Sequence, residues 1–142
     1  MKGVATLIRL QRHALVERKK ALALLTDEAA RINQAIVGLE SGLVHEKQLA
    51  SQDPTLARSF PMFLQATLKR RAALANMLAD VARRIAAAES EIADVFRELK
   101  AFELAEKDAR DRAAHEAAQH EQKKLDEIGG AMHRRVGGIG LA

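Results

Sequence analysis

The feature that most constrains this chain is a run of apolar residues spaced seven apart through its first third. The run consists of Ile8, Leu15, Leu22, Ala29, Ile36, Leu43 and Ala50, and apolar residues such as Leu25, Ile32 and Leu39 fill the three- and four-residue steps between them. A mean spacing of about 3.5 residues keeps one stripe of a helix against a partner helix along its whole length. The pattern therefore predicts a coiled-coil helix over residues 4–52.

A second seam with the same steps runs from Phe60 to Phe102. The segment between the two seams begins with Asp53 and Pro54, a pair that favours a helix start because the carboxylate caps free amides and proline tolerates the first helical position. The sequence predicts a turn over residues 53–60, which includes a one-turn helix ending at Arg58. A second long helix is expected to begin at Phe60, with Ser59 as its cap.

Folding the chain back near residue 55 places residues whose numbers sum to 110 opposite each other, and bulky residues then meet bulky ones along most of the pairing. We predict an all-α fold, a long antiparallel two-helix coiled-coil hairpin held within one chain. Its expected core residues are Ile8, Leu15, Leu22, Leu25, Ile32, Ile36, Leu74, Leu78, Ile85, Ile92, Val95, Leu99 and Phe102.

The second helix is expected to continue to residue 128, where Gly129 and Gly130 should end it. On the predicted register, residues beyond Glu106 have no counterpart in the first helix, so the second helix overhangs by about 22 residues, or roughly 30 Å. An isolated Ala-rich helix of this length is marginal in water, so the overhang is interpreted as an element that binds a partner. Residues 129–142 are predicted to be disordered, and residues 1–142 to form a single domain.

Two glycines, Gly38 and Gly42, lie inside the first predicted helix, where each costs about 1 kcal/mol relative to alanine. On the predicted register, Arg71 falls opposite Leu39. We interpret the glycines as making room for the Arg71 side chain rather than as a hinge.

Composition excludes several classes of chemistry. The 142 residues include no cysteine, tryptophan or tyrosine, so neither a disulfide nor a thiolate site is available. No apolar run reaches the length of a membrane span, which predicts a soluble, cytoplasmic protein. Two fragments imitate the HExxH zinc motif, His45 with Glu46 and His115 with Glu116, but neither has a second histidine four residues after the first. We expect no enzymatic activity, no metal and no cofactor.

The charge pattern is uneven. Residues 1–24 carry six bases and one acid, for a net charge of +5, whereas residues 98–127 carry nine acids and six bases, for −3. An antiparallel hairpin brings these two segments to the same end, where opposite charges meet. The dibasic clusters lack interleaved aromatic residues, so at most weak, salt-sensitive nucleic-acid binding is expected, without sequence specificity. Membrane insertion is not expected.

Three stretches of the chain are distinctive in combination. They are, in order, TLIRLQRHALVERKKAL, SQDPTLARSFPMFLQATLKRRAAL and FRELKAFELAEKDARDRAAHEAAQHEQKKLDEIGGAMHRR. Together they resemble the flagellar export protein FliJ family as found in alphaproteobacteria. The resemblance covers nearly the whole chain. The equivalent stalk protein of virulence type III secretion systems shares the architecture and is the nearest rival within it.

This resemblance implies a stalk- and chaperone-type component of the flagellar type III export apparatus, in the cytoplasm and peripheral to the flagellar base at the inner membrane. The implied partners are the hexameric export ATPase, the cytoplasmic domain of the export gate, and export chaperones. The implied ATPase-binding residues at the terminal end are Arg9, Arg12, Lys19, Lys20, Lys107, Arg110, Asp111 and Arg112. By position, the nearest matches to the gate-binding residues are His45, Leu49 and Phe63. The alternative is a generic coiled-coil adaptor or a weak nucleic-acid binder.

Overall fold

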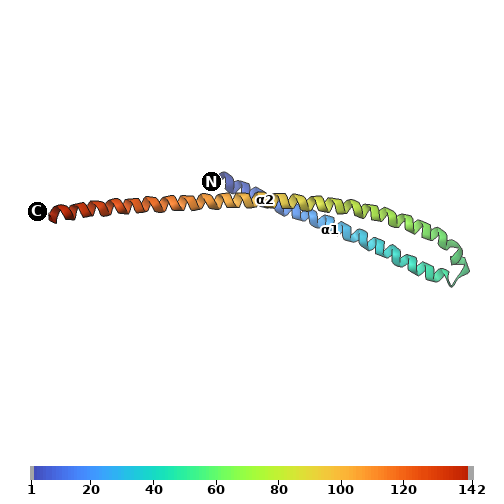
Figure 1. Ribbon diagram of the computed structural model, residues 1–142. Helices are drawn as coiled ribbons and strands as arrows, with labels where there is room; N and C mark the ends of the chain where they lie inside the picture. Colours follow the sequence, from blue (N-terminus) through green and yellow to red (C-terminus); the bar gives the residue numbers. More distant parts are fainter. Residues whose placement is uncertain (1, 141–142) are drawn as a thin grey trace. The chain divides into compact units, whose positions relative to one another are not determined.

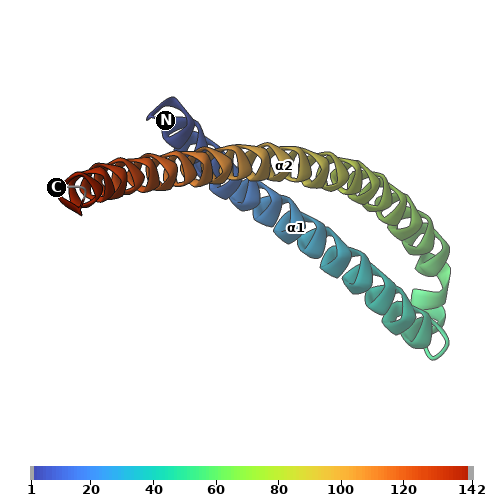
Figure 2. The same ribbon diagram turned by 60° about the vertical axis from the view of Figure 1, so that its left-hand side comes forward.

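The computed structural model describes residues 2–140, and the side chains of residues 2–137. It contains two helices, α1 from Lys2–Ala50 and α2 from Pro54–Gly140, and no strand among the described residues. A short connection after Ala50 reverses the chain, so that α2 runs back along α1 (Figures 1 and 2). The predicted antiparallel two-helix hairpin is confirmed.

The chain divides into two compact units. The hairpin unit is Arg12–Phe96, and the terminal unit consists of Met1–Gln11 together with Arg97–Ala142. Both helices are continuous through the points where the units meet. The expected single domain over residues 1–142 stays a prediction.

The core of each unit lies on the predicted seams. In the hairpin unit, Ile32, Leu74 and Val81 are buried and form one cluster, against which Ala29, Ile36, Leu39, Leu78 and Ile85 pack. In the terminal unit, Ile8 and Leu99 are buried. All of the residues expected in the core are buried or half-buried. A two-helix interface leaves part of most seam side chains open to water, and no side chain among the described residues falls below 2% exposure.

Three polar residues that interrupt the seams, Gln11, Arg18 and Arg71, are bound to glutamates on the facing helix. Gln11 donates from Nε2 to Oε2 of Glu98 at 2.8 Å in the terminal unit. In the hairpin unit, Arg18 pairs with Glu91 at 2.5 Å, and Arg71 pairs with Glu40 at 2.8 Å. Each pair lies within one residue of the predicted register. A slip of one heptad would part all three pairs, so these residues specify the register more than they add stability.

At the turn, Asp53 caps α2 as expected. Its Oδ1 accepts a hydrogen bond from the Thr55 amide at 2.9 Å, and its carbonyl accepts one from the Ala57 amide at 2.9 Å. The separate one-turn helix is not formed, because α2 is continuous from Pro54 and includes Pro61. Ser59 therefore lies inside α2, where its hydroxyl donates to the Leu56 carbonyl at 3.1 Å rather than capping a new helix.

The C-terminal boundary of α2 also differs from the expectation. The helix continues past Ile128 to Gly140, so described residues 129–140 of the expected tail are helical. A glycine that ends a helix usually takes a positive φ, and no described glycine has one. Residues 141 and 142 of that tail lie outside the described residues.

Gly38 and Gly42 do not make room for a neighbour. A Cβ placed on either glycine would meet no heavy atom within 4 Å, apart from the flanking residues and local helix backbone. Arg71 reaches Glu40 without needing this space. The room-making hypothesis is therefore wrong, and the two glycines only lower helix propensity.

We expect Gly38→Ala and Gly42→Ala each to raise the free energy of unfolding by about 1 kcal/mol, because alanine is the better helix former and the site is open. Urea denaturation followed by circular dichroism measures the change. Gly3→Ala, in the first turn of α1, is a control with a smaller expected gain, because a helix end tolerates glycine better than a helix interior. A loss of stability at Gly38 or Gly42 would show that the glycine is required after all.

Candidate functional site

The terminal unit presents one long unpartnered segment of α2, which we call the arm (residues 110–140). Every described side chain from Arg110 to Gly137 is exposed, except at half-buried Gly130. At 1.5 Å per residue the arm is about 45 Å long, longer than the predicted overhang because α2 passes Gly129. In Figure 1 the arm is the orange-to-red part of α2.

The residues expected to bind the ATPase fall in both units. Five lie in the terminal unit and are all exposed, namely Arg9, Lys107, Arg110, Asp111 and Arg112. Arg110 approaches Glu106 at 3.9 Å, one turn earlier on the same helix. The other three, Arg12, Lys19 and Lys20, lie in the hairpin unit, where Lys20 pairs with Glu17 at 3.4 Å.

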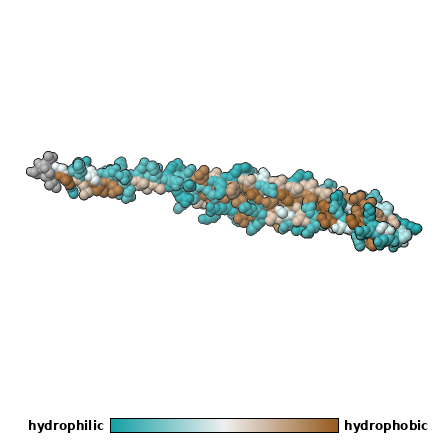
Figure 3. Space-filling view, turned by 60° about the horizontal axis from the view of Figure 1, so that its bottom comes forward, coloured by the Kyte–Doolittle hydropathy of each residue, from teal (hydrophilic) through white to brown (hydrophobic). Residues whose placement is uncertain are grey.

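The arm also carries an apolar stripe that the sequence analysis missed. Leu125, Ile128, Met132 and Val136 are 57%, 56%, 61% and 69% exposed. Their spacing of three, four and four residues places them along one side of the helix. The spacing is visible in the sequence, but the expected helix end at Gly129 cut the stripe in half. Hydrophilic surface dominates much of the arm in Figure 3, interrupted by smaller hydrophobic patches.

The residues matched to the gate-binding surface all lie in the hairpin unit, near the turn. His45 is exposed and Leu49 is half-buried in the last two turns of α1. Phe63, in the third turn of α2, is 39% exposed although its ring is large and apolar. Exposed aromatic side chains are typical of docking surfaces.

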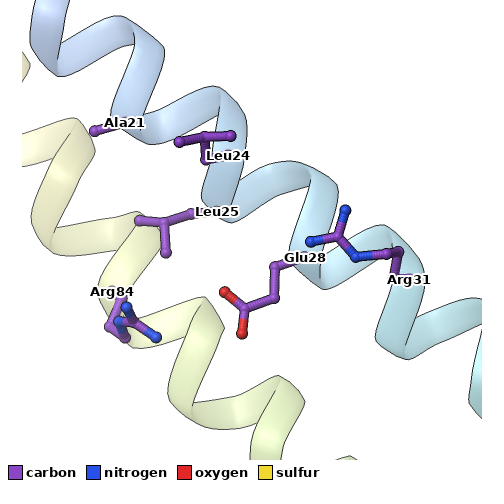
Figure 4. A pocket seen from close by; sticks show the side chains of 6 residues that line it. All are labelled: Ala21, Leu24, Leu25, Glu28, Arg31 and Arg84. Atoms are coloured by element: carbon purple, nitrogen blue, oxygen red, sulfur yellow. The ribbon is translucent and has the colours of Figure 1, made fainter.

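An open hollow of about 400 Å³ lies in the middle of the hairpin unit. Ala21, Leu24, Leu25, Glu28 and Arg31 of α1 line it together with Arg84 of α2. Figure 4 shows the Glu28 carboxylate directed across the hollow toward Arg84. The lining residues include no nucleophile next to a base and no pair of neighbouring carboxylates. The hollow therefore resembles a surface groove rather than an active site.

The histidines do not assemble a metal centre. Among the described residues, no group of three or more histidine, cysteine, aspartate or glutamate side chains is placed to hold a metal ion. His45 and His115 lie in different units, each exposed on its helix. The described helices also include no stretch that is both long and apolar enough to cross a bilayer.

These features define a class of protein: a two-helix coiled-coil hairpin whose second helix continues into a long, exposed arm. The family model described as flagellar FliJ protein matches residues 1–138. The chain belongs to the FliJ family, a family of components of the flagellar export system. No curated protein and no solved structure matches the chain.

Proposed function

We propose that this chain is a non-enzymatic stalk- and chaperone-type component of the flagellar type III protein export apparatus. Its terminal end binds the hexameric export ATPase, the hairpin near the turn binds the cytoplasmic domain of the export gate, and export chaperones are further partners. The observation that carries the proposal is the family match over residues 1–138. Because the matching family is flagellar, it favours flagellar export over the virulence system.

The arm supports the ATPase half of the proposal. α2 has 87 residues and α1 has 49, so α1 cannot cover all of α2. A helix without a partner gains little from burial, and contacts with a surrounding ring would offset the entropy of ordering it. The arm carries exposed charged residues and the apolar stripe. It can therefore make both the polar and the apolar contacts that are typical of protein interfaces.

No enzymatic step is assigned to this chain. A reaction requires groups that converge on one reacting atom, and the hollow in the hairpin unit is an open groove on a helix pair. The proposed work of the chain is binding, with no cofactor. We place it in the cytoplasm, peripheral to the flagellar base at the inner membrane, because its proposed partners assemble there.

The direct test is a pull-down of the purified full chain with the hexameric export ATPase, in low and in high salt. Binding at both salt concentrations is expected, because the arm offers apolar as well as charged contacts. Binding to unrelated DNA that matches or exceeds ATPase binding, and that vanishes in high salt, would instead support the weak nucleic-acid binder.

We expect Phe63→Ala to weaken binding to the gate domain by about tenfold and to reduce motility, because it removes an exposed aromatic anchor. Helicity should be unchanged, since the side chain lies outside the buried core cluster. Phe96→Ala is the matched control, because Phe96 is similarly exposed at 47% and lies at the other end of the hairpin unit. Normal motility and gate binding in the Phe63 variant would contradict the assignment.

A further inference from the structure

The first 26 residues of α2 contain no acidic residue. Between Asp53 and Asp80 the sequence has four bases, Arg58, Lys69, Arg70 and Arg71, and no aspartate or glutamate. From Asp80 to Glu127, in contrast, acids and bases are interspersed along α2. Arg71 is taken up by its ion pair with Glu40, whereas Lys69 and Arg70 form no ion pair among the described residues.

Lys69 and Arg70 share one side of α2 with exposed apolar residues. Met62, Ala66 and Lys69 are four and three residues apart, so they follow one another along the helix, and Phe63 and Arg70 lie beside them at a spacing of seven. Met62 is 79% exposed and Phe63 is 39% exposed. We call these five residues the tip face. The hydrophobic patches near the turn in Figure 3 show how apolar surface reaches solvent at this end of the hairpin unit.

The tip face has a shallow hollow at its centre. Met62, Gln65, Ala66 and Lys69 line a space of about 300 Å³, with the small Ala66 side chain between the larger ones. A partner side chain can enter above Ala66 and contact the Met62 thioether while its own charge lies beside Lys69. Methionine suits such a contact because its flexible side chain adapts to the shape of a partner.

We propose that the tip face binds an acidic protein surface, one with an apolar pocket for Met62 and Phe63 and carboxylates placed to meet Lys69 and Arg70. Positive charge without any neighbouring acid on the same helix complements such a surface and would repel a basic one. This inference rests on the proposed function, since it specifies the chemistry that the hairpin end requires of the export gate. It adds Met62, Ala66, Lys69 and Arg70 to the surface around Phe63.

An anionic bilayer is the competing anionic partner, and the charges of the hairpin unit disfavour it. The α1 side of the same end carries Glu46, and Asp53 lies in the connection itself, whereas Glu40 is paired with Arg71. A flat negative surface approaching this end meets these carboxylates along with Lys69 and Arg70. A protein surface can instead engage one side of α2 alone, which is where the positive charge is concentrated.

The test compares two double charge reversals in the full chain, with the isolated cytoplasmic domain of the export gate as the probe. Lys69→Glu with Arg70→Glu is expected to weaken binding by about tenfold or more, because two attractive contacts become repulsive. The matched control is Arg83→Glu with Arg84→Glu, an adjacent dibasic pair on the same helix that lies beyond the acid-free stretch. The control makes the same change in net charge and is expected to bind within about twofold of the unaltered chain.

Two further measurements separate the contributions. Met62→Ala is expected to weaken binding by about fivefold at any salt concentration, whereas the effect of the Lys69 and Arg70 reversal should shrink as salt rises. Circular dichroism should show unchanged helicity in every variant, because these side chains are exposed.

Equal losses from both charge reversals would overturn the proposal in favour of a bulk charge effect. The Lys69 and Arg70 reversal could instead leave gate binding unchanged and abolish binding to vesicles that contain anionic phospholipid. That result would overturn the proposal in favour of a membrane partner. If the same reversal abolished only self-association, a second copy of the chain would be the partner. If the unaltered chain itself does not bind the gate domain, the proposed function fails at this end. If it binds and the Lys69 and Arg70 reversal binds equally well, only the present inference fails.

Discussion

A chain that lacks residues 107–142 is expected to lose binding to the export ATPase while its hairpin stays folded. The deletion removes the whole arm, including the apolar stripe and four of the residues assigned to ATPase binding, but none of the buried core residues. The removed segment has seven bases and six acids, a net charge of +1, so the truncated chain keeps nearly the same net charge. Loss of binding would therefore reflect the missing surface rather than a change in overall charge.

Three measurements on the truncated chain make this prediction decisive. A pull-down with the ATPase reports binding, circular dichroism with thermal melting reports the hairpin, and binding to the gate domain serves as the positive control. The hairpin unit does not include residues 107–142, so its melting should persist. Retained ATPase binding would refute the role assigned to the arm, and a chain that melts without cooperativity would show that the arm stabilises the hairpin.

Leu74→Ala is expected to lower the free energy of unfolding by about 3 kcal/mol. Leu74 is 5% exposed and belongs to the core cluster with Ile32 and Val81, so truncation removes buried methyl groups and leaves a cavity between the helices. A loss of this size is a large part of the stability that a chain of this length normally has. Urea denaturation followed by circular dichroism measures it.

The matched control for this substitution is Leu24→Ala. This substitution removes the same atoms in the same unit, but Leu24 is 70% exposed. The free energy of unfolding is therefore expected to change by no more than about 0.5 kcal/mol. Equal effects at the two positions would mean that the seam is not the core of the hairpin. A large effect at Leu24 alone would indicate that its face is buried in an assembly.

The hairpin was predictable because its stabilising interactions follow a period that can be read from the sequence. Ile32 and Leu74 lie where the heptad spacing places them, and both are buried. Asp53 and Pro54 mark the turn through local chemistry, and the cap forms. The register was predictable from the positions of the large apolar side chains alone. The ion pairs of Arg18 with Glu91 and of Arg71 with Glu40 agree with that register.

The predictions that failed concern the effect of glycines and the apolar residues that lie outside the seams. Gly129 and Gly130 are poor helix formers, yet α2 passes through them, so propensity at two positions did not decide the helix end. The interpretation of Gly38 and Gly42 failed because the space beside a glycine depends on where neighbouring side chains lie. Leu125, Ile128, Met132 and Val136 were overlooked because the helix was expected to stop among them.

The sequence by itself predicted that two apolar stripes pair within one chain, because each heptad seam must be buried against another helix and the turn at Asp53 and Pro54 returns the second seam along the first. It also carried the order of motifs through which family membership was foreseen. The overhang was also predicted, but only the tertiary structure decided how far it continues, that it carries the apolar stripe, and that Met62 and Lys69 line one exposed face near the turn. The physical reason is that burial in a seam depends on spacing along one chain, whereas exposure of any other residue depends on what its neighbours cover.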